Sequence, residues 1–381
     1  MTRNIYFSVC GEGYGHSSRD LAIAKALSEN GCEILMGGYG YVFDRLSRSF
    51  KSVKIQREFE MVGNGGSFDL KATILRSKKT AFQFSKLISE EKKIMQEFNA
   101  TCVVADGRSA AVFAAFSLGI PCVIISNQTS LEPFFKESSF FVRLLGKPVE
   151  MTLKTITALA ENTIIPDFSP PDTVCIKSLS NSPHIMKKQS FVGPVVSIDR
   201  DSKNDVPMNM KTPFVLTLLG GHSYRLPIFD NILKIANRFP EMNFLIFTIF
   251  KSDTVPENVR IMEFAEDISS YMKAAEIIIT QAGHSTAMEI MTLGKASLLI
   301  PDQGQTEQES NSERMKELGV CETIQYSSLS ADLLSAKIEA LLSDERYKEK
   351  AMYYSEMARK MNGPVKAAGI IMDLSERIQY Y

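Results

Sequence analysis

Short apolar runs alternate with helical patterns along the first half of the chain. The runs NIYFSVC, CEILMGG, TCVVAD and PCVIISN are separated by segments whose apolar residues recur at helical spacing, the longest being residues 70–98. Strands this short and this apolar, separated by helices, are typical of a parallel sheet that is covered on both faces. The pattern therefore predicts a doubly wound α/β domain.

The same alternation restarts in the second half. The runs PFVLTLLGG, NFLIFTIF, AEIIIT and ASLLIP again alternate with helical stretches, and three more helical stretches end the chain. The polar, proline-bearing segment 181–213 between the halves places a domain boundary close to residues 193–196. We therefore expect two Rossmann-like, doubly wound parallel-sheet domains that face a cleft, residues 1–196 and 197–363. A C-terminal helix over 364–381 should follow.

Charge and cysteine usage narrow the class of protein. The net charge is -1, but residues 1–196 carry 23 Lys and Arg against 18 Asp and Glu, so the first half is mildly basic and the second half acidic. This asymmetry favours different partners for the two halves and is too weak for nucleic-acid binding. The six cysteines lie mostly in apolar runs without a Cys-x-x-Cys pair, which is typical of reduced thiols in the cytoplasm. We expect no signal peptide and no transmembrane helix.

Three of the four histidines occur in the tripeptide Gly-His-Ser, at His16, His222 and His284. Each tripeptide lies where a predicted strand leads into a helix. The unpaired N–H groups and the positive dipole end of such a helix can hold a phosphate or another anion. Two copies in the second half suggest a diphosphate ligand there.

The first copy, in GEGYGH, differs from a dinucleotide fingerprint. Its glycines are spaced G-x-G-x-G, His16 takes the last position, and no acidic residue ends the strand CEILMGG. These differences disfavour an NAD or FAD site, and we expect no cofactor. His16 is instead a candidate general base, and Asp106 at the end of TCVVAD is a candidate partner that orients its ring. Asp106 could also, or instead, cap the helix that follows it.

Two segments resemble nucleotide-sugar glycosyltransferases of the GT-B fold, a group that includes MurG and the plant UDP-glycosyltransferases. GEGYGHSSRDLAIAKAL resembles their opening glycine-rich loop and histidine, and TQAGHSTAMEIMTLGKASLLIPDQGQTEQESNSERMKELG is similar to their donor-binding segment. The resemblance implies that residues 1–196 bind the acceptor and residues 197–363 bind the nucleotide sugar. It also implies that the helix 364–381 crosses back to the N-terminal domain.

The resemblance assigns a role to each matching residue. Ser285 and Thr286 match the residues that hold the diphosphate, and Glu289 matches the glutamate that binds the ribose hydroxyls. Glu307 and Gln308 match the pair that contacts the sugar. The remaining implied contacts are Gly220, Gly221, His222 and Ser223 in the phosphate-facing turn, Phe264 and Ala265 beside a uracil base, Gln281 near phosphate, Gly283 and His284 behind the phosphate loop, and Gly13, Tyr14 and Gly15 in the acceptor loop.

Together these features predict an inverting, metal-independent transfer of a hexose or N-acetylhexosamine from a nucleotide sugar, with UDP favoured, to an acceptor hydroxyl. The acceptor could be lipid-linked or a polysaccharide. The segment 131–156, with its phenylalanines and basic residues, is either a surface that meets a membrane holding a lipid-linked acceptor or an amphipathic helix packed on its own sheet. The glycine-rich loop 61–69 is a candidate acceptor flap. Two other functions fit the same fold: a nucleotide-sugar 2-epimerase, and a non-catalytic donor-binding subunit of a membrane glycosyltransferase complex.

Overall fold

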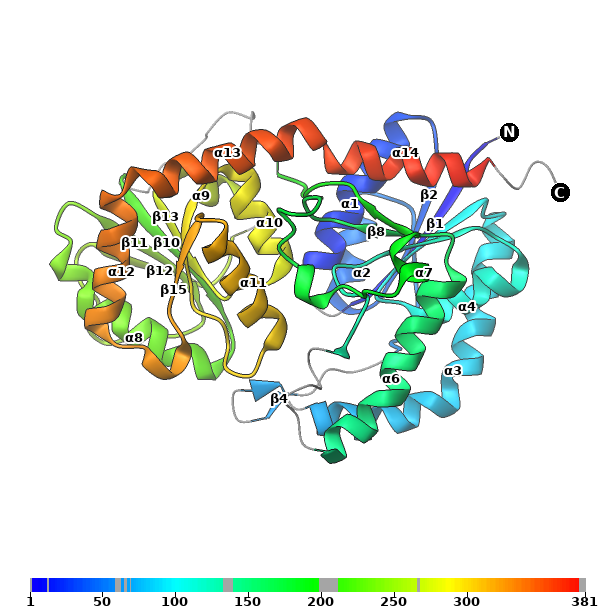
Figure 1. Ribbon diagram of the computed structural model, residues 1–381, viewed down its shortest axis with the longest axis horizontal. Coiled ribbons are helices and arrows are strands. Elements are labelled where there is room, and N and C mark those ends of the chain that lie inside the picture. The colour runs from blue at the N-terminus through cyan, green and yellow to red at the C-terminus, as the bar shows by residue number, and fades with distance from the viewer. Residues whose placement is uncertain are drawn as a thin grey trace. The chain divides into compact units, whose positions relative to one another are not determined.

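The chain divides into two compact units in the computed structural model. The model describes residues 2–11, 14–58, 63–64, 67–68, 70–132, 140–198, 212–265 and 268–376, at some of them the backbone alone. The first unit comprises Met1–Val62, Asp69–Ser197 and Met361–Tyr381, and the second comprises Gly63–Phe68 and Ile198–Lys360. The C-terminal segment of the chain is therefore part of the first unit (Figure 1).

A seven-stranded parallel sheet forms the centre of the first unit, in the order β3-β2-β1-β6-β7-β8-β9. Its strands are β1 (Asn4–Val9), β2 (Glu33–Gly38), β3 (Ser52–Lys54), β6 (Cys102–Asp106), β7 (Cys122–Ile125), β8 (Asn162–Ile165) and β9 (Gln189–Phe191). The strand order reverses between β1 and β6, with Val9 paired to Asp106. Ligands of open α/β sheets bind outside the carboxyl ends of the strands at such a reversal.

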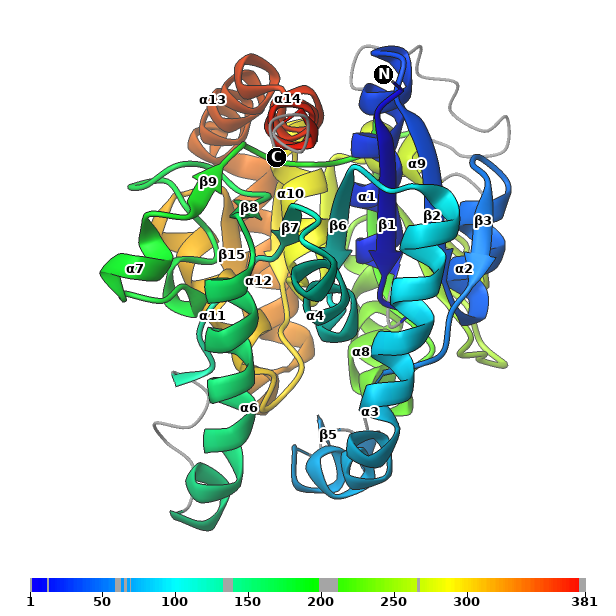
Figure 2. The ribbon, with the colours of Figure 1, turned by 90° about the vertical axis from the view of Figure 1, so that its right-hand side faces the viewer.

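Helices cover both faces of this sheet because its strands carry apolar side chains on both sides. The helices of the unit are α1 (Tyr14–Glu29), α2 (Gly40–Ser47), α3 (Leu70–Phe98), α4 (Ser109–Leu118), α6 (Phe140–Leu159), α7 (Pro183–Met186) and α14 (Gly363–Ser375). Helices α1, α2 and α14 share one core with one face of the sheet, and α14 packs beside α1 (Figure 1). Helices α3, α4 and α6 share a second core with the other face (Figure 2).

The second unit repeats the same topology in a six-stranded parallel sheet, with the order β12-β11-β10-β13-β14-β15. Its strands are β10 (Phe214–Gly220), β11 (Asn243–Thr248), β12 (Val259–Met262), β13 (Ile277–Thr280), β14 (Ala296–Leu299) and β15 (Cys321–Thr323). Here the order reverses between β10 and β13. A separate antiparallel pair, β4 (Gly63–Asn64) with β5 (Ser67–Phe68), belongs to the same unit.

The helices of the second unit are α8 (Leu226–Ile235), α9 (Ser269–Ala274), α10 (His284–Leu293), α11 (Thr306–Glu317), α12 (Ala331–Ser343) and α13 (Glu345–Met361). Helices α8 and α12 pack their apolar residues on one face of the sheet. Short 3-10 turns lie at Ile176–Ser178 in the first unit, and at Ser223–Arg225, Ala236–Arg238 and Tyr326–Ser328 in the second. Within the part of the chain that the structure describes, no helix has the length and apolar character needed to cross a membrane.

The predicted fold class is confirmed: the chain contains two doubly wound parallel sheets with the Rossmann strand order. Two details differ from the sequence-based expectation. The segment 181–213, read as a linker, contains helix α7 and the edge strand β9 of the first sheet. His16, expected just before a helix, lies inside the first turn of α1.

Candidate functional site

The predicted histidine and aspartate meet at the strand-order reversal of the first sheet. Nδ1 of His16 lies 2.7 Å from Oδ1 of Asp106, and the side chain of Asp106 is 1% exposed while that of His16 is 29% exposed. A proton on Nδ1 that is donated to Asp106 leaves the lone pair of Nε2 available to accept another proton. The pair can therefore act as a general base with an oriented ring.

The backbone at the ends of β1 and β6 brings these two residues together. The N–H of Cys10 donates to the carbonyl of Asp106 over 2.9 Å, which joins the two strand ends. Gly107 has a φ of +65°, and a Cβ there would lie 2.9 Å from Cβ of Cys10 and 3.5 Å from Cε1 of His16. Glycine is therefore favoured at position 107, because this left-handed φ strains other residues and a Cβ would lie too close to Cβ of Cys10.

The alternative role of Asp106, as a cap for the next helix, is wrong. Helix α4 begins at Ser109 after Arg108, and the carboxylate of Glu58 accepts the N–H groups of Ser109 (3.0 Å) and Ala110 (3.2 Å). The oxygens of Asp106 are instead used by His16 and by Arg19. The carboxylate that stabilises the helix start thus comes from a distant part of the chain.

A second acidic residue, Asp20, lies beside this pair and is fully buried. Neither of its carboxylate oxygens has a hydrogen-bond partner among the described residues. Burial raises the pKa of Asp20 well above its usual range, and the nearby negative charge of Asp106 raises it further. Asp20 is therefore held in the neutral, protonated form in the folded protein.

We expect the Asp20→Asn variant to become more stable relative to the wild type as the pH rises. The folded wild type retains the Asp20 proton at pH values where the unfolded chain has lost it, so its stability falls as the pH rises above about 4. Asparagine has no such proton to lose. Urea unfolding at pH 5, 6.5 and 8 measures the difference. The exposed Asp44→Asn on α2 is the control, and a D20N difference that is constant with pH contradicts the prediction.

The structure describes only part of the predicted acceptor loop. Gly13 lies outside the described residues, and for Tyr14 the backbone alone is described, as the first residue of α1. Gly15 is half-buried in the first turn of the same helix. The predicted acceptor flap, 61–69, lies largely outside the described residues.

In the second unit, the two predicted phosphate loops also meet at the strand-order reversal. The first begins at the last residue of β10 and contains Gly220, Gly221, His222 and Ser223, all of them exposed. The ring of His222 stacks on Tyr224 at 5.3 Å, and partial burial together with the charge of Arg225 lowers its pKa. His222 is therefore neutral at physiological pH and can donate or accept a hydrogen bond.

The second loop follows β13 and leads into α10. Gly283 precedes the helix and makes no side-chain cap, and the N–H groups at the start of a helix can hold an anion. Ser285 and Thr286 lie half-buried in this first turn, and Glu289 lies one turn further along the helix. His284 is 5% exposed, consistent with a structural position behind the loop.

A buried asparagine of helix α11 supports this loop. Asn311 is fully buried, and its Nδ2 donates to the carbonyl of Ala282 over 3.1 Å. Ala282 has a φ of +65°, a left-handed conformation that is uncommon for residues other than glycine. The buried Gln281 next to it has an Nε2 without a partner among the described residues. Asn311 thus holds the turn that aims the start of α10.

Gln308, predicted to contact the sugar, is engaged within the protein. Its Oε1 accepts the N–H of Asp302 over 2.8 Å, and its Nε2 donates to Oδ2 of Asp302 over 3.2 Å. Asp302 in turn binds Arg225, whose Nε lies 2.9 Å from Oδ1. Arg225 also donates to the carbonyl of Leu219 over 2.6 Å. These contacts join the loop after β10 to the loop before α11, so the two loops form one assembly.

The remaining predicted contacts lie at the surface of the second unit. Glu307 is half-buried at the start of α11, and Ala265 is half-buried after β12. Phe264 is 67% exposed, so it does not pack in a core. An exposed aromatic ring is available to stack on a planar ligand.

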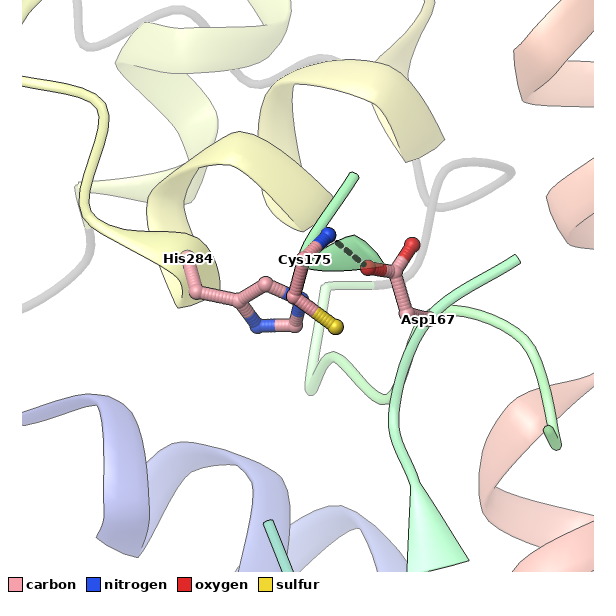
Figure 3. Close-up of side chains that lie close together, drawn as sticks. All are labelled: Asp167, Cys175 and His284. Carbon is pink, nitrogen blue, oxygen red and sulfur yellow. Dashed lines mark hydrogen bonds between the residues drawn. The ribbon is translucent and has the colours of Figure 1, made fainter. Parts of the chain in front are cut away.

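A further buried carboxylate lies in the loop after β8. Asp167 is fully buried and accepts the backbone N–H groups of Phe168 (2.7 Å), Val174 (3.2 Å) and Cys175 (2.8 Å), the last of which is drawn in Figure 3. Three such donors stabilise a carboxylate that has lost its water. Within the first unit, Asp167 therefore organises the 168–175 loop.

Sequence reasoning missed Arg19, Arg225 and Asp302. Arg19 could have been found from its position three residues after His16, because residues three apart lie on the same face of a helix. Arg225 and Asp302 are far apart in sequence, and only the fold brings them together.

The chain matches two families of known proteins. The family "Glycosyl transferase family 1" matches residues 3–206, and the family "Glycosyltransferase family 28 C-terminal domain" matches residues 237–363. An uncharacterized glycosyltransferase of Methanosarcina acetivorans is 34% identical over 368 residues, covering 94% of this chain and 95% of the relative. The glycotransferase of kitacinnamycin has a similar fold, with a TM-score of 0.76 at 15% identity over 98% of this chain and 99% of that one.

A more distant relative has a named activity. The UDP-N-acetylglucosamine--N-acetylmuramyl-(pentapeptide) pyrophosphoryl-undecaprenol N-acetylglucosamine transferase of Bacillus cytotoxicus is 22% identical over 317 residues, covering 79% of this chain and 80% of the relative. The family matches and the archaeal relative extend across both Rossmann-like units. The chain belongs to the glycosyltransferases of the GT-B fold.

Proposed function

We propose that this protein is an inverting glycosyltransferase that moves a hexose or N-acetylhexosamine from a UDP sugar to an acceptor hydroxyl. The observation that carries the proposal is the 2.7 Å contact between His16 and the buried Asp106. In the proposed reaction, Nε2 of His16 removes the proton of the acceptor hydroxyl while its oxygen attacks the anomeric carbon. Asp106 stabilises the imidazolium that forms. A single displacement of this kind inverts the configuration at that carbon.

The second unit would bind the donor. The uncapped start of α10, with Ser285 and Thr286, suits the diphosphate, and the half-buried Glu289 suits the ribose hydroxyls. Charge develops on the diphosphate as it leaves, and N–H groups aimed at that position stabilise it. We expect no metal requirement, because the helix start and the loop after β10 provide this stabilisation.

We further propose UDP as the nucleotide and a lipid-linked hydroxyl as the acceptor. The relative from Bacillus cytotoxicus is named for a UDP sugar and a pyrophosphoryl-undecaprenol acceptor. Helix α6 supports the acceptor proposal, because Leu144, Val149 and Met151 are exposed on it next to the exposed Lys147 and Lys154. Apolar side chains flanked by lysines suit the interface of an anionic membrane. The protein would then act at the cytoplasmic face of a membrane.

The donor assignment predicts which ligand stabilises the protein. We expect UDP sugars, in a panel with TDP and GDP sugars, to raise the melting temperature most, since a ligand at a hundredfold its Kd adds about 2.7 kcal/mol. Replacing Glu289 by Gln should weaken binding at least about tenfold, because hydrogen bonds to a charged group contribute about 1.5–3 kcal/mol. Titration calorimetry measures this change.

The matched control is Glu317→Gln, at the exposed end of the neighbouring helix α11. It should bind the donor as the wild type does. The proposal is wrong if no nucleotide sugar stabilises the protein, and the role of Glu289 is wrong if E289Q binds donor as tightly as the control.

A further inference from the structure

An arginine contacts both members of the His16–Asp106 pair. Arg19 lies three residues after His16 on α1, and its Nε donates to Oδ2 of Asp106 over 2.6 Å while Nη2 donates to Oδ1. The same Nη2 lies 3.1 Å from Nδ1 of His16. The guanidinium therefore uses both oxygens of Asp106 in the bidentate geometry that orients a carboxylate most firmly.

Arg19 and Asp106 form a buried ion pair. Removing both charges from water costs free energy, and loss of either charge would leave the other without its partner. Arg19 is 5% exposed and Asp106 is 1% exposed, so neither charge is well solvated by water. Two opposite buried charges stabilise each other only when their geometry is good and their remaining hydrogen bonds are satisfied. The bidentate contact meets this condition.

The other charged and titratable groups around the pair can be named element by element. Helix α1 contributes Arg19 and the neutral Asp20, and strand β6 contributes Asp106. The Cys10 thiol follows β1 and lies 3.5 Å from the hydroxyl of Tyr39, which follows β2. Arg45 of α2 approaches the hydroxyl of Ser17 at 3.3 Å. Arg19 is a cation that contacts both members of the pair.

We propose that Arg19 is a positioning residue: it holds the carboxylate of Asp106 in place for His16 and balances the negative charge of that carboxylate. This inference rests on the proposed role of His16 as the base. An aspartate alone would stabilise the imidazolium before the acceptor arrives. A guanidinium 3.1 Å from Nδ1 opposes the positive charge that such protonation would place on the ring.

Nuclear magnetic resonance tests the inference without any turnover. The chain has only four histidines, so the ring signal of His16 can be assigned as the one that disappears in His16→Ala. We expect Arg19→Gln to raise the pH midpoint of this signal by about one unit, because removal of a like charge within a few ångströms favours the charged ring. Arg19→Lys keeps the charge without the bidentate geometry and should give a smaller rise.

The exposed His184 provides an internal control, since its signal should titrate equally in all variants. Arg45→Gln removes an arginine that donates to the hydroxyls of Ser17 and Ser18, and it should leave the His16 midpoint within a few tenths of a unit. An unchanged His16 midpoint in R19Q, with native circular dichroism, would overturn the inference. If R19Q does not fold, R19K decides: a midpoint equal to that of the wild type overturns the inference, and a raised midpoint supports it.

The outcome of the magnetic resonance titration does not depend on whether the protein transfers sugar. If the protein transfers no sugar but R19Q shifts the midpoint, the proposed function fails and the inference about Arg19 stands. If transfer is observed, the acidic limb of its pH profile should move to higher pH in R19Q. An unchanged profile and an unchanged midpoint would leave Arg19 with a structural role only.

Discussion

His16→Ala should transfer sugar about 10²- to 10⁴-fold more slowly than the wild type, the usual contribution of a positioned general base. The Kd of the UDP sugar should not change, because His16 belongs to the first unit and the proposed donor contacts belong to the second. Steady-state kinetics with a saturating donor measure the first effect, and titration calorimetry measures the second. Loss of kcat with an unchanged donor Kd distinguishes a base from a donor ligand.

Two further variants sharpen the interpretation. Asp106→Asn should also reduce kcat strongly, because an amide can present its N–H to Nδ1 and so hold the wrong tautomer of His16. His184→Ala, on the exposed helix α7, is the matched control and should retain full activity. The assignment of His16 as the base is contradicted if H16A keeps a rate within about threefold of that of H184A.

Both sheets and the contact between His16 and Asp106 could be predicted from the sequence because these features depend on local patterns. Apolar runs of strand length predicted the parallel sheets, and the Gly-His-Ser tripeptides marked loops after β1, β10 and β13. In a parallel sheet the loops after neighbouring strands meet at one edge. The positions of His16 and Asp106 after neighbouring strands therefore sufficed to predict that the two residues lie close together.

The supporting contacts could not be predicted, because they join residues through space rather than along the chain. Glu58 caps a helix that begins fifty-one positions later, a separation that no capping motif covers. Gln308 matched a sugar-binding position, yet the fold gives its amide to Asp302. Asn311 is fully buried, and its amide donates to the backbone of Ala282. Burial decides which polar side chains remain available to a ligand, and a motif does not record burial.

A buried network around Arg108, two residues after Asp106, connects the site to the core of the first unit. Arg108 is 3% exposed, and its Nη2 donates to Oε1 of Glu91 over 3.0 Å. Glu91 also accepts the hydroxyl of Tyr6 (2.7 Å) and that of Ser8 (2.8 Å), both on β1. The Arg108 guanidinium thus offsets the charge of a carboxylate that has almost no access to water.

We expect Arg108→Met to lower the free energy of unfolding of the first unit by at least about 3–5 kcal/mol, the usual cost of leaving one buried charge without its partner. The buried Glu58, 3.8 Å from the Arg108 guanidinium, also loses its neighbouring positive charge. Urea unfolding followed by circular dichroism measures the loss. The control is Lys93→Met, which breaks an ion pair with Glu97 on the same helix as Glu91. This pair spans 3.7 Å, and its side chains are 76% and 67% exposed, so its loss should cost less than about 1 kcal/mol.

Adding Glu91→Leu to R108M should restore part of the stability, because it removes an unpaired carboxylate. If R108M costs no more than the control, the Glu91 carboxylate does not depend on Arg108. The Arg108 network would then not explain how the edge of the sheet that carries Asp106 is held to the core of the first unit.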